Sequence, residues 1–98
     1  MRLKEGKRPQ IIPVHPGEIL RDELESRGIS RRTLAKTIGI TEGYICDLCH
    51  CRRNIGADMA VRLSRALGAS PEFWLNAKLM WELSQVDSDK HAEIQAIN

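Results

Sequence analysis

The sequence predicts an all-α domain of five short helices, and three observations support this fold class. No window of the 98 residues alternates apolar and polar side chains as a half-buried strand does. Apolar residues instead recur at helical spacing, between capping residues and glycines that mark helix ends. Aromatic residues are scarce, so the core must consist mainly of leucine, isoleucine and alanine, which suit small helices better than sheets.

Length and composition limit the possible classes of protein. A chain of 98 residues forms one domain, and 42% hydrophobic with 29% charged residues is a globular balance. No apolar stretch is long enough to span a membrane, and the first ten residues do not lead into the apolar core of a secretory signal. We therefore expect a soluble, cytoplasmic protein with a basic arm at residues 1–14, one domain at 15–86 and a polar tail at 87–98.

The first helix is expected to begin at residues 15–17 and to end at Gly28. Pro16 suits the first turn of a helix, and His15 is placed to act as its capping residue. Glycine is the usual residue just past the end of a helix. The inward-facing side chains are Ile19, Leu20 and Leu24.

Residues 30–49 are predicted to form two helices joined by a very short turn. Ser30 caps the first of these helices and Gly39 ends it, while Thr41 caps the second. The expected inward side chains are Leu34, Ala35 and Ile38 in the first helix and Ile45 and Leu48 in the second.

Three residues of this pair match the helix-turn-helix motif. Ala35 is small enough for two helices to cross closely, Gly39 accepts the positive φ of the turn, and Ile45 anchors the second helix. The second helix of this motif enters the major groove of DNA. Basic residues exceed acidic ones by four over residues 27–53, which suits contact with a polyanion.

Two further helices are expected after the polar loop at residues 50–56. The first carries apolar residues at i, i+3 and i+7 and ends at Gly68. These apolar residues are Ala60, Leu63 and Leu67. The second starts at Ser70, Pro71 and Glu72, which supply an N-cap, a proline in the first turn and an acidic charge near the helix N-terminus.

The last helix carries two apolar stripes, whereas a lone surface helix needs only one. One stripe consists of Phe73, Trp74, Ala77 and Trp81, and the other of Leu75, Leu79 and Leu83. We therefore expect a homodimer formed through this helix; the alternative is that the aromatic residues complete a thin core. The expected dimer interface comprises Trp74, Leu75, Lys78, Leu79 and Trp81.

The run SRRTLAKTIGITEGYICDLCHCRR, followed by AVRLSRALGASPEFWLN, resembles the Cro/C1-type (XRE) DNA-binding domain, a five-helix, lambda-repressor-like fold. Within that family, the opening HPGEILRDELESRGIS and the closing SPEFWLN resemble the HigA/VapI-type antitoxins. This resemblance covers about residues 15–85. It implies a homodimer that binds double-stranded operator DNA, represses its own operon and neutralises a HigB-type toxin, a messenger-RNA-cleaving ribonuclease.

The same resemblance implies which residues contact DNA. Bases would be read from residues 41–47, and phosphates would be bound by arginines on either side. The implied DNA-binding residues are Arg31, Arg32, Thr41, Glu42, Gly43, Tyr44, Asp47, Arg52 and Arg53.

The chain departs from the family pattern at two places in this region. Glu42 and Asp47 are acidic, whereas many relatives have Gln, Asn or Arg at reading positions. A carboxylate accepts a hydrogen bond from a cytosine amino group but repels phosphate, so the two residues indicate either cytosine readout or weaker DNA binding. His50 and Cys51 replace the usual Asn-Gly turn, which leaves the geometry of the following loop open.

Three cysteines and a histidine fall within six residues and raise the question of a cofactor. Residues 46–50 spell C-x-x-C-H, the attachment signature of c-type haem, and Cys46, Cys49 and His50 share a helix face that suits zinc. We expect neither haem nor a metal, because no export signal precedes the motif and all candidate ligands belong to one segment. Cys46 is expected to be half-buried and Cys49 and Cys51 exposed and prone to oxidation, which leaves redox control of DNA binding as an alternative.

No nucleophile, base and orienting acid stand in a recognisable relation, so we do not expect an enzyme. Two alternatives to an antitoxin stay open. One is a stand-alone helix-turn-helix repressor without a toxin. The other is a protein-interaction module that does not bind DNA, which the acidic Glu42 and Asp47 would favour.

Overall fold

The computed structural model describes residues 13–97, and this part of the chain contains five α-helices and no strand. The helices are α1 (Pro16–Arg27), α2 (Arg31–Ile38), α3 (Glu42–Cys49), α4 (Ala57–Leu67) and α5 (Pro71–Ser84), followed by a 3₁₀ turn, η1 (Ser88–His91). The all-α prediction is confirmed. Residues 1–12 of the predicted basic arm lie outside the described residues.

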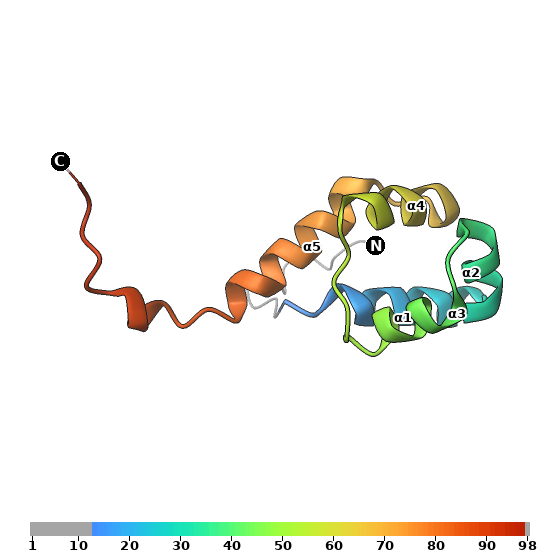
Figure 1. Cartoon of the computed structure of the whole chain (residues 1–98), viewed down its shortest axis with the longest axis horizontal. Helices are drawn as coiled ribbons and strands as arrows, with labels where there is room; N and C mark the ends of the chain where they lie inside the picture. The colour runs from blue at the N-terminus through green and yellow to red at the C-terminus, as the bar shows by residue number, and fades with distance from the viewer. Residues whose placement is uncertain (1–12, 98) are drawn as a thin grey trace, which may run out of the picture.

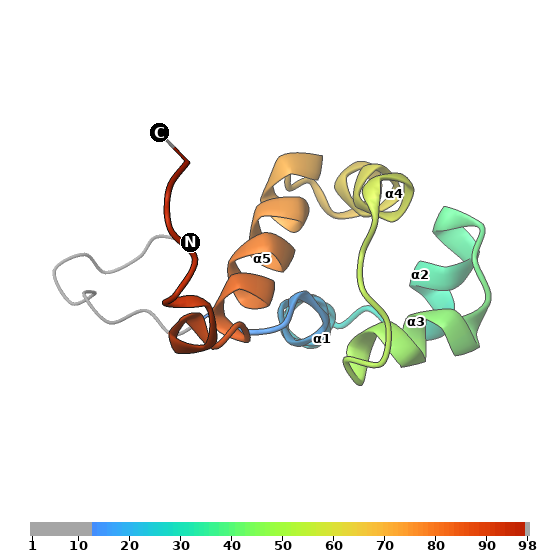
Figure 2. The ribbon, with the colours of Figure 1, turned by 60° about the vertical axis from the view of Figure 1, so that its left-hand side comes forward.

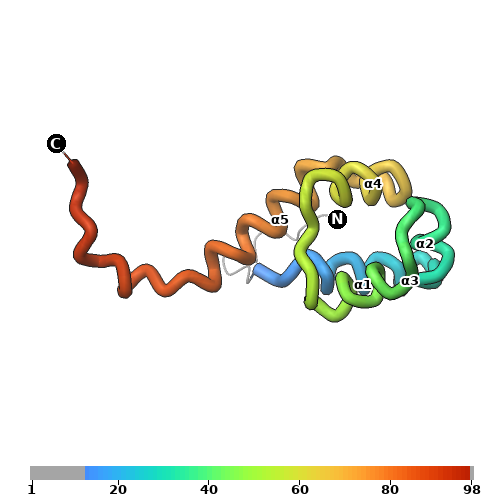
Figure 3. The backbone as a smooth tube through the Cα atoms, in the orientation of Figure 1, coloured from blue at the N-terminus to red at the C-terminus, as the bar shows by residue number. Residues whose placement is uncertain are grey.

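The helices form a closed body from which the C-terminal segment extends (Figure 1). α2 packs against α3 and α4, α1 packs against α3 and α5, and α5 also packs against α4. Figure 2 shows α5 running from the end of α4 down to the start of α1. The backbone trace in Figure 3 shows the segment after α5 leading away from this body, and residues 85–97 are exposed throughout. Among residues 13–97, no helix has both the length and the apolar character needed to cross a bilayer.

Side chains cap four of the five helices at the positions that the sequence predicts. The Nδ1 atom of His15 accepts a hydrogen bond from the backbone N–H of Gly17 at 2.9 Å. The hydroxyl groups of Ser30, Thr41 and Ser70 accept from the third backbone N–H beyond them, at 3.0, 3.1 and 3.0 Å. Each such cap satisfies a backbone donor that has no partner within the helix and contributes about 1 kcal/mol.

The core draws apolar side chains from all five helices. The inward residues predicted for the second, third and fourth helices are all buried, as are Leu20 and Leu24 of the first. Ile55, in the loop before α4, is also fully buried, although it was not among the residues predicted to face the core. Because this side chain fills the core, the loop between α3 and α4 is fixed to the body of the domain.

α1 and α3 approach each other closely at Gly17. A Cβ atom at this position would lie 1.9 Å from the carbonyl oxygen of Leu48, far inside van der Waals contact. Only glycine therefore allows the start of α1 to pack against the end of α3.

Three arginines bind the carboxyl ends of other helices. A helix C-terminus presents carbonyl groups without intrahelical partners and a partial negative charge, both of which a guanidinium satisfies. Since these three arginines bind carbonyl groups of the protein itself, part of the positive charge counted in the sequence stabilises the packing of the helices. The contacts run from Arg21 to Cys49 O at 3.5 Å, from Arg27 to Leu67 O at 2.7 Å and from Arg62 to Ile38 O.

Candidate nucleic-acid interface

The turn between α2 and α3 has the geometry of a helix-turn-helix. Gly39 lies in the left-handed region with φ 75°, and its N–H donates to Ala35 O. Ile40 N–H donates to the same carbonyl at 3.0 Å. Ala35 and Ile45 are 3% and 0% exposed, so both are packed between the helices as the motif requires. Ala35, Gly39 and Ile45 thus have the burial and the turn conformation that a helix-turn-helix requires.

The helix-turn-helix leaves one face of α3 on the surface. Thr41 caps the helix, and its exposed neighbours Glu42 and Gly43 occupy the first turn. Tyr44 completes the first turn, Asp47 lies in the second, and both are partly exposed. The five positions implied as base-reading are thus brought together on one accessible face.

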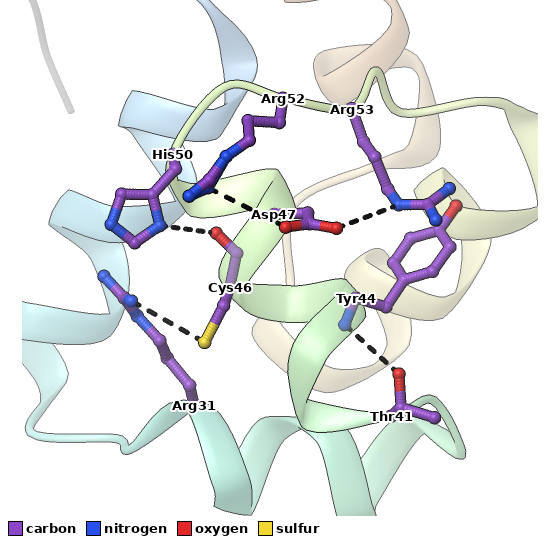
Figure 4. A network of polar contacts seen from close by, with 8 residues as sticks. All are labelled: Arg31, Thr41, Tyr44, Cys46, Asp47, His50, Arg52 and Arg53. Atoms are coloured by element: carbon purple, nitrogen blue, oxygen red, sulfur yellow. Dashed lines mark hydrogen bonds and ion pairs between the residues drawn. The ribbon is translucent and has the colours of Figure 1, made fainter.

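Asp47 lies at the centre of a cluster of charged groups (Figure 4). Its two carboxylate oxygens face Arg52 Nη1 at 3.8 Å and Arg53 Nε at 3.6 Å. The guanidinium of Arg53 also stacks over the Tyr44 ring, 4.2 Å from its centroid, in a cation–π contact.

A second pair of the same kind lies at the start of α3. Here Glu42 Oε1 faces Arg32 Nε at 3.5 Å, and both side chains are well exposed. Exposed ion pairs contribute only about 0–1 kcal/mol each, so a phosphate group can displace any of these partners. Both carboxylates of the reading helix are therefore paired with arginines that the resemblance assigns to DNA.

The turn after α3 explains how Arg52 and Arg53 reach Asp47. Cys51 lies in the left-handed region with φ 62°, a conformation that glycine usually supplies after a helix. Its N–H donates to Leu48 O at 3.0 Å, and Arg52 N–H donates to Asp47 O at 2.8 Å. The loop after α3 thus begins with a tight helix-ending turn that directs the chain back over α3.

Arg31, at the start of α2, lies beside the same helix. Its Nη1 donates to the Sγ atom of Cys46 at 3.8 Å, as Figure 4 shows. This contact further raises the pKa of the Arg31 guanidinium, which is therefore always charged. Arg31 has no carboxylate partner among the ion pairs of residues 13–97.

The prediction for the cysteines is right for Cys46 and wrong for Cys49. Cys46 is partly buried, as expected. Cys49, expected to be exposed, is 0% exposed, because it lies on the face of α3 that carries Ile45 into the core. Burial raises the pKa of both Cys49 and Cys51, and Cys51 is partly rather than fully exposed. Within residues 13–97, no three His, Cys, Asp or Glu side chains are grouped as ligands of one metal ion.

The side chains predicted for a dimer interface divide into two groups. Trp74 is 1% exposed in the core of its own domain, and the Trp81 ring packs edge-on against His15 with centroids 4.7 Å apart. Leu75 and Lys78 are half-buried, and Leu79 is 51% exposed. Other large apolar side chains are exposed on the same helix, and the predicted interface omits them: Phe73, Met80 and Leu83.

Comparison with known proteins places this arrangement among helix-turn-helix proteins. The family model described as helix-turn-helix matches residues 20–74. Virulence-associated protein I of Dichelobacter nodosus is 36% identical over 94% of this chain and 85% of its own length.

Solved structures of high similarity include two proteins of the HigA type. The antitoxin HigA of Pseudomonas aeruginosa, solved with the higBA promoter, is 36% identical with a TM-score of 0.79. The addiction module antidote protein of the HigA family from Coxiella burnetii is 34% identical, also with a TM-score of 0.79. In each case the match covers 89% of this chain and 100% of the other.

Proposed function

This chain belongs to the helix-turn-helix family that includes HigA and virulence-associated protein I, and we propose that it is a DNA-binding antitoxin that represses its own operon. The observation that carries this proposal is the accessible face of α3, with arginines on both sides of it. Proteins of this class are regulators and not enzymes. The proposed partners, operator DNA and a toxin that acts on messenger RNA, are both cytoplasmic.

The side chains around α3 divide into two roles on double-stranded DNA. Thr41, Glu42, Gly43, Tyr44 and Asp47 face the base edges in the major groove. Arginine suits phosphate because its charge is fixed and its donors form a fork. The phosphate-binding set is Arg31, Arg32, Arg52 and Arg53.

A homodimer formed through α5 would present two copies of α3. Leu79, Met80 and Leu83 are more than half exposed on this helix, which is unfavourable unless they are covered. Two-fold symmetry in the protein suits the paired half-sites of an operator. The dimer therefore supports DNA binding as well as the stability of a small domain.

The toxin partner is proposed to be a HigB-type, messenger-RNA-cleaving ribonuclease. Support comes from the two similar structures, which are named as an antitoxin and an antidote protein. The alternatives are a stand-alone repressor and an interaction module without DNA binding. The carboxylates of Glu42 and Asp47 on the reading face favour the last of these.

Co-expression with the small open reading frame beside the gene tests this proposal. We expect the neighbour alone to arrest growth, and this chain to restore growth and to co-purify with it. A reporter fused to the upstream DNA should be repressed at the same time.

A double variant separates the two activities. Arg52→Ala with Arg53→Ala should lose repression of the reporter but still restore growth, because neither side chain is buried and the fold is kept. A harmless neighbour, or one that does not bind, contradicts the toxin partnership and leaves a plain repressor. An unrepressed reporter with the wild-type chain contradicts the DNA-binding role.

A further inference from the structure

Asp47 and the arginines paired with it carry an inference about sequence specificity, which rests on the proposed DNA binding. In the free protein the Asp47 carboxylate occupies the guanidinium groups of Arg52 and Arg53, at 3.8 and 3.6 Å. These are two of the side chains assigned to phosphate. Figure 4 shows them meeting Asp47 from opposite sides on the outward face of α3. The carboxylate therefore takes the place that a DNA phosphate would take.

Binding to DNA requires an exchange of partners. Arg52 and Arg53 gain phosphates, but Asp47 then loses both cations and faces a negatively charged groove. An unpaired carboxylate at this position opposes binding, unless the DNA itself supplies a hydrogen-bond donor. The net gain in binding free energy from the two phosphate contacts thus depends on which base lies opposite Asp47.

The major groove offers few donors that suit a carboxylate. Only cytosine N4 and adenine N6 carry amino groups there, and the adenine amino group lies beside the N7 acceptor, which repels a carboxylate. Guanine and thymine present acceptors at the corresponding positions. Cytosine is therefore the base that compensates Asp47 for the loss of its arginines.

We propose that Asp47 determines specificity by making the phosphate contacts of Arg52 and Arg53 conditional on a cytosine amino group in the major groove. At other sequences the three side chains keep their internal ion pairs, and binding is weak. Where a cytosine lies opposite Asp47, the carboxylate accepts a hydrogen bond from that base. Both arginines are then free to bind phosphates of the DNA backbone. Arg53 stays close to α3 during this exchange, because it stacks on Tyr44.

Glu42 does not carry the same argument. It has a single arginine partner and lies in the first turn of α3, where the helix dipole already stabilises a negative charge. Asp47 lies in the second turn, beyond that support, and has two partners.

The test compares wild type with Asp47→Asn, which keeps the shape of the side chain and removes its charge. On a random-sequence duplex, Asp47→Asn should bind about five- to tenfold more tightly, because two exposed ion pairs no longer compete with phosphate. The slope of log affinity against log salt should steepen by about 1 to 2, since up to two more phosphates are neutralised. Asp47→Glu should stay close to wild type.

Glu23→Gln is the matched control. It removes an equal charge and an equally exposed ion pair, to Arg27 at 2.6 Å. Glu23 lines a pocket with residues from the end of α4 and the start of α5, and no residue of α3 lines that pocket. Neither affinity for random DNA nor its salt dependence should change in this variant.

Selection from a random duplex library then tests the cytosine requirement. Wild type should enrich a site with one invariant cytosine per half-site, and exchange of that cytosine for thymine should weaken binding about tenfold. Asp47→Asn should tolerate this exchange with less than about a twofold loss.

The outcomes separate this inference from the proposed function. A wild-type protein that enriches no sequence overturns DNA binding and the inference with it. Enrichment by wild type, with the same cytosine requirement and the same affinity for random DNA in Asp47→Asn, overturns the role of Asp47 alone. Thermal unfolding of each variant verifies that the fold is kept, as expected for a partly exposed side chain.

Discussion

Replacement of Gly17 by alanine is expected to lower the free energy of unfolding by about 2–3 kcal/mol. The new Cβ atom would lie 1.9 Å from Leu48 O, whereas real contacts of this kind are essentially never below 3.0 Å. α1 and α3 must therefore separate by about 1 Å or more, which forces apart side chains that are packed at crystal-like density. The start of α1 has little room to move, since Pro16 is buried beside it and the His15 ring contacts Trp81.

Thermal or urea unfolding measures this effect, with Gly43→Ala as the matched control. Nothing lies within 4 Å of a Cβ atom at Gly43, which is also in a helix. We expect Gly43→Ala to gain about 0.5–1 kcal/mol from the better helix propensity of alanine. Gly17→Ala should lose about 10–20 °C in Tm, at 4–8 °C for each kcal/mol. A Tm within about 3 °C of wild type for Gly17→Ala would refute the close contact between α1 and α3.

Three further predictions follow from particular side chains. Arg31→Ala should weaken binding to all sequences alike and reduce the salt slope by about 1, as anisotropy titrations at several salt concentrations can measure; a loss confined to one sequence would contradict a phosphate role. Leu79→Glu should convert the dimer to a monomer in sedimentation, because Leu79 is 51% exposed on α5 and the dimer would bury the new charge. An unchanged mass would exclude this surface as the interface. Cys51→Gly should raise the free energy of unfolding by up to about 1 kcal/mol, since φ 62° strains any other residue; a lower Tm would contradict that.

The fold follows closely from local signals in the sequence. Ser30, Thr41 and Ser70 are the caps, and Gly28, Gly39 and Gly68 have the positive φ values of helix ends. These signals act within a few residues, and the inward stripes follow from helical periodicity alone. The burial of Ile55 could not be predicted in this way, because a loop residue has no periodicity that would indicate its burial.

The candidate site is only partly predictable for the same reason. Sequence position brings Glu42 and Asp47 onto the face of α3, but their arginine partners depend on tertiary geometry. Arg52 and Arg53 reach Asp47 only because Cys51 takes a left-handed turn that its type does not favour. The burial of Cys49, in contrast, could have been predicted, because Cys49 lies four residues after Ile45 on the same face of α3.

Binding to the DNA upstream of its own gene, measured against salt, is the most direct test of DNA recognition by this protein. A duplex of that sequence and a random duplex of equal length would be titrated with the full chain at several salt concentrations. We expect the affinity to fall steeply with salt, by about 0.9 in the logarithmic slope for each phosphate contacted, and to be about 10³-fold or more higher for the upstream sequence. Equal affinity for both duplexes, or an affinity that does not change with salt, would contradict this expectation.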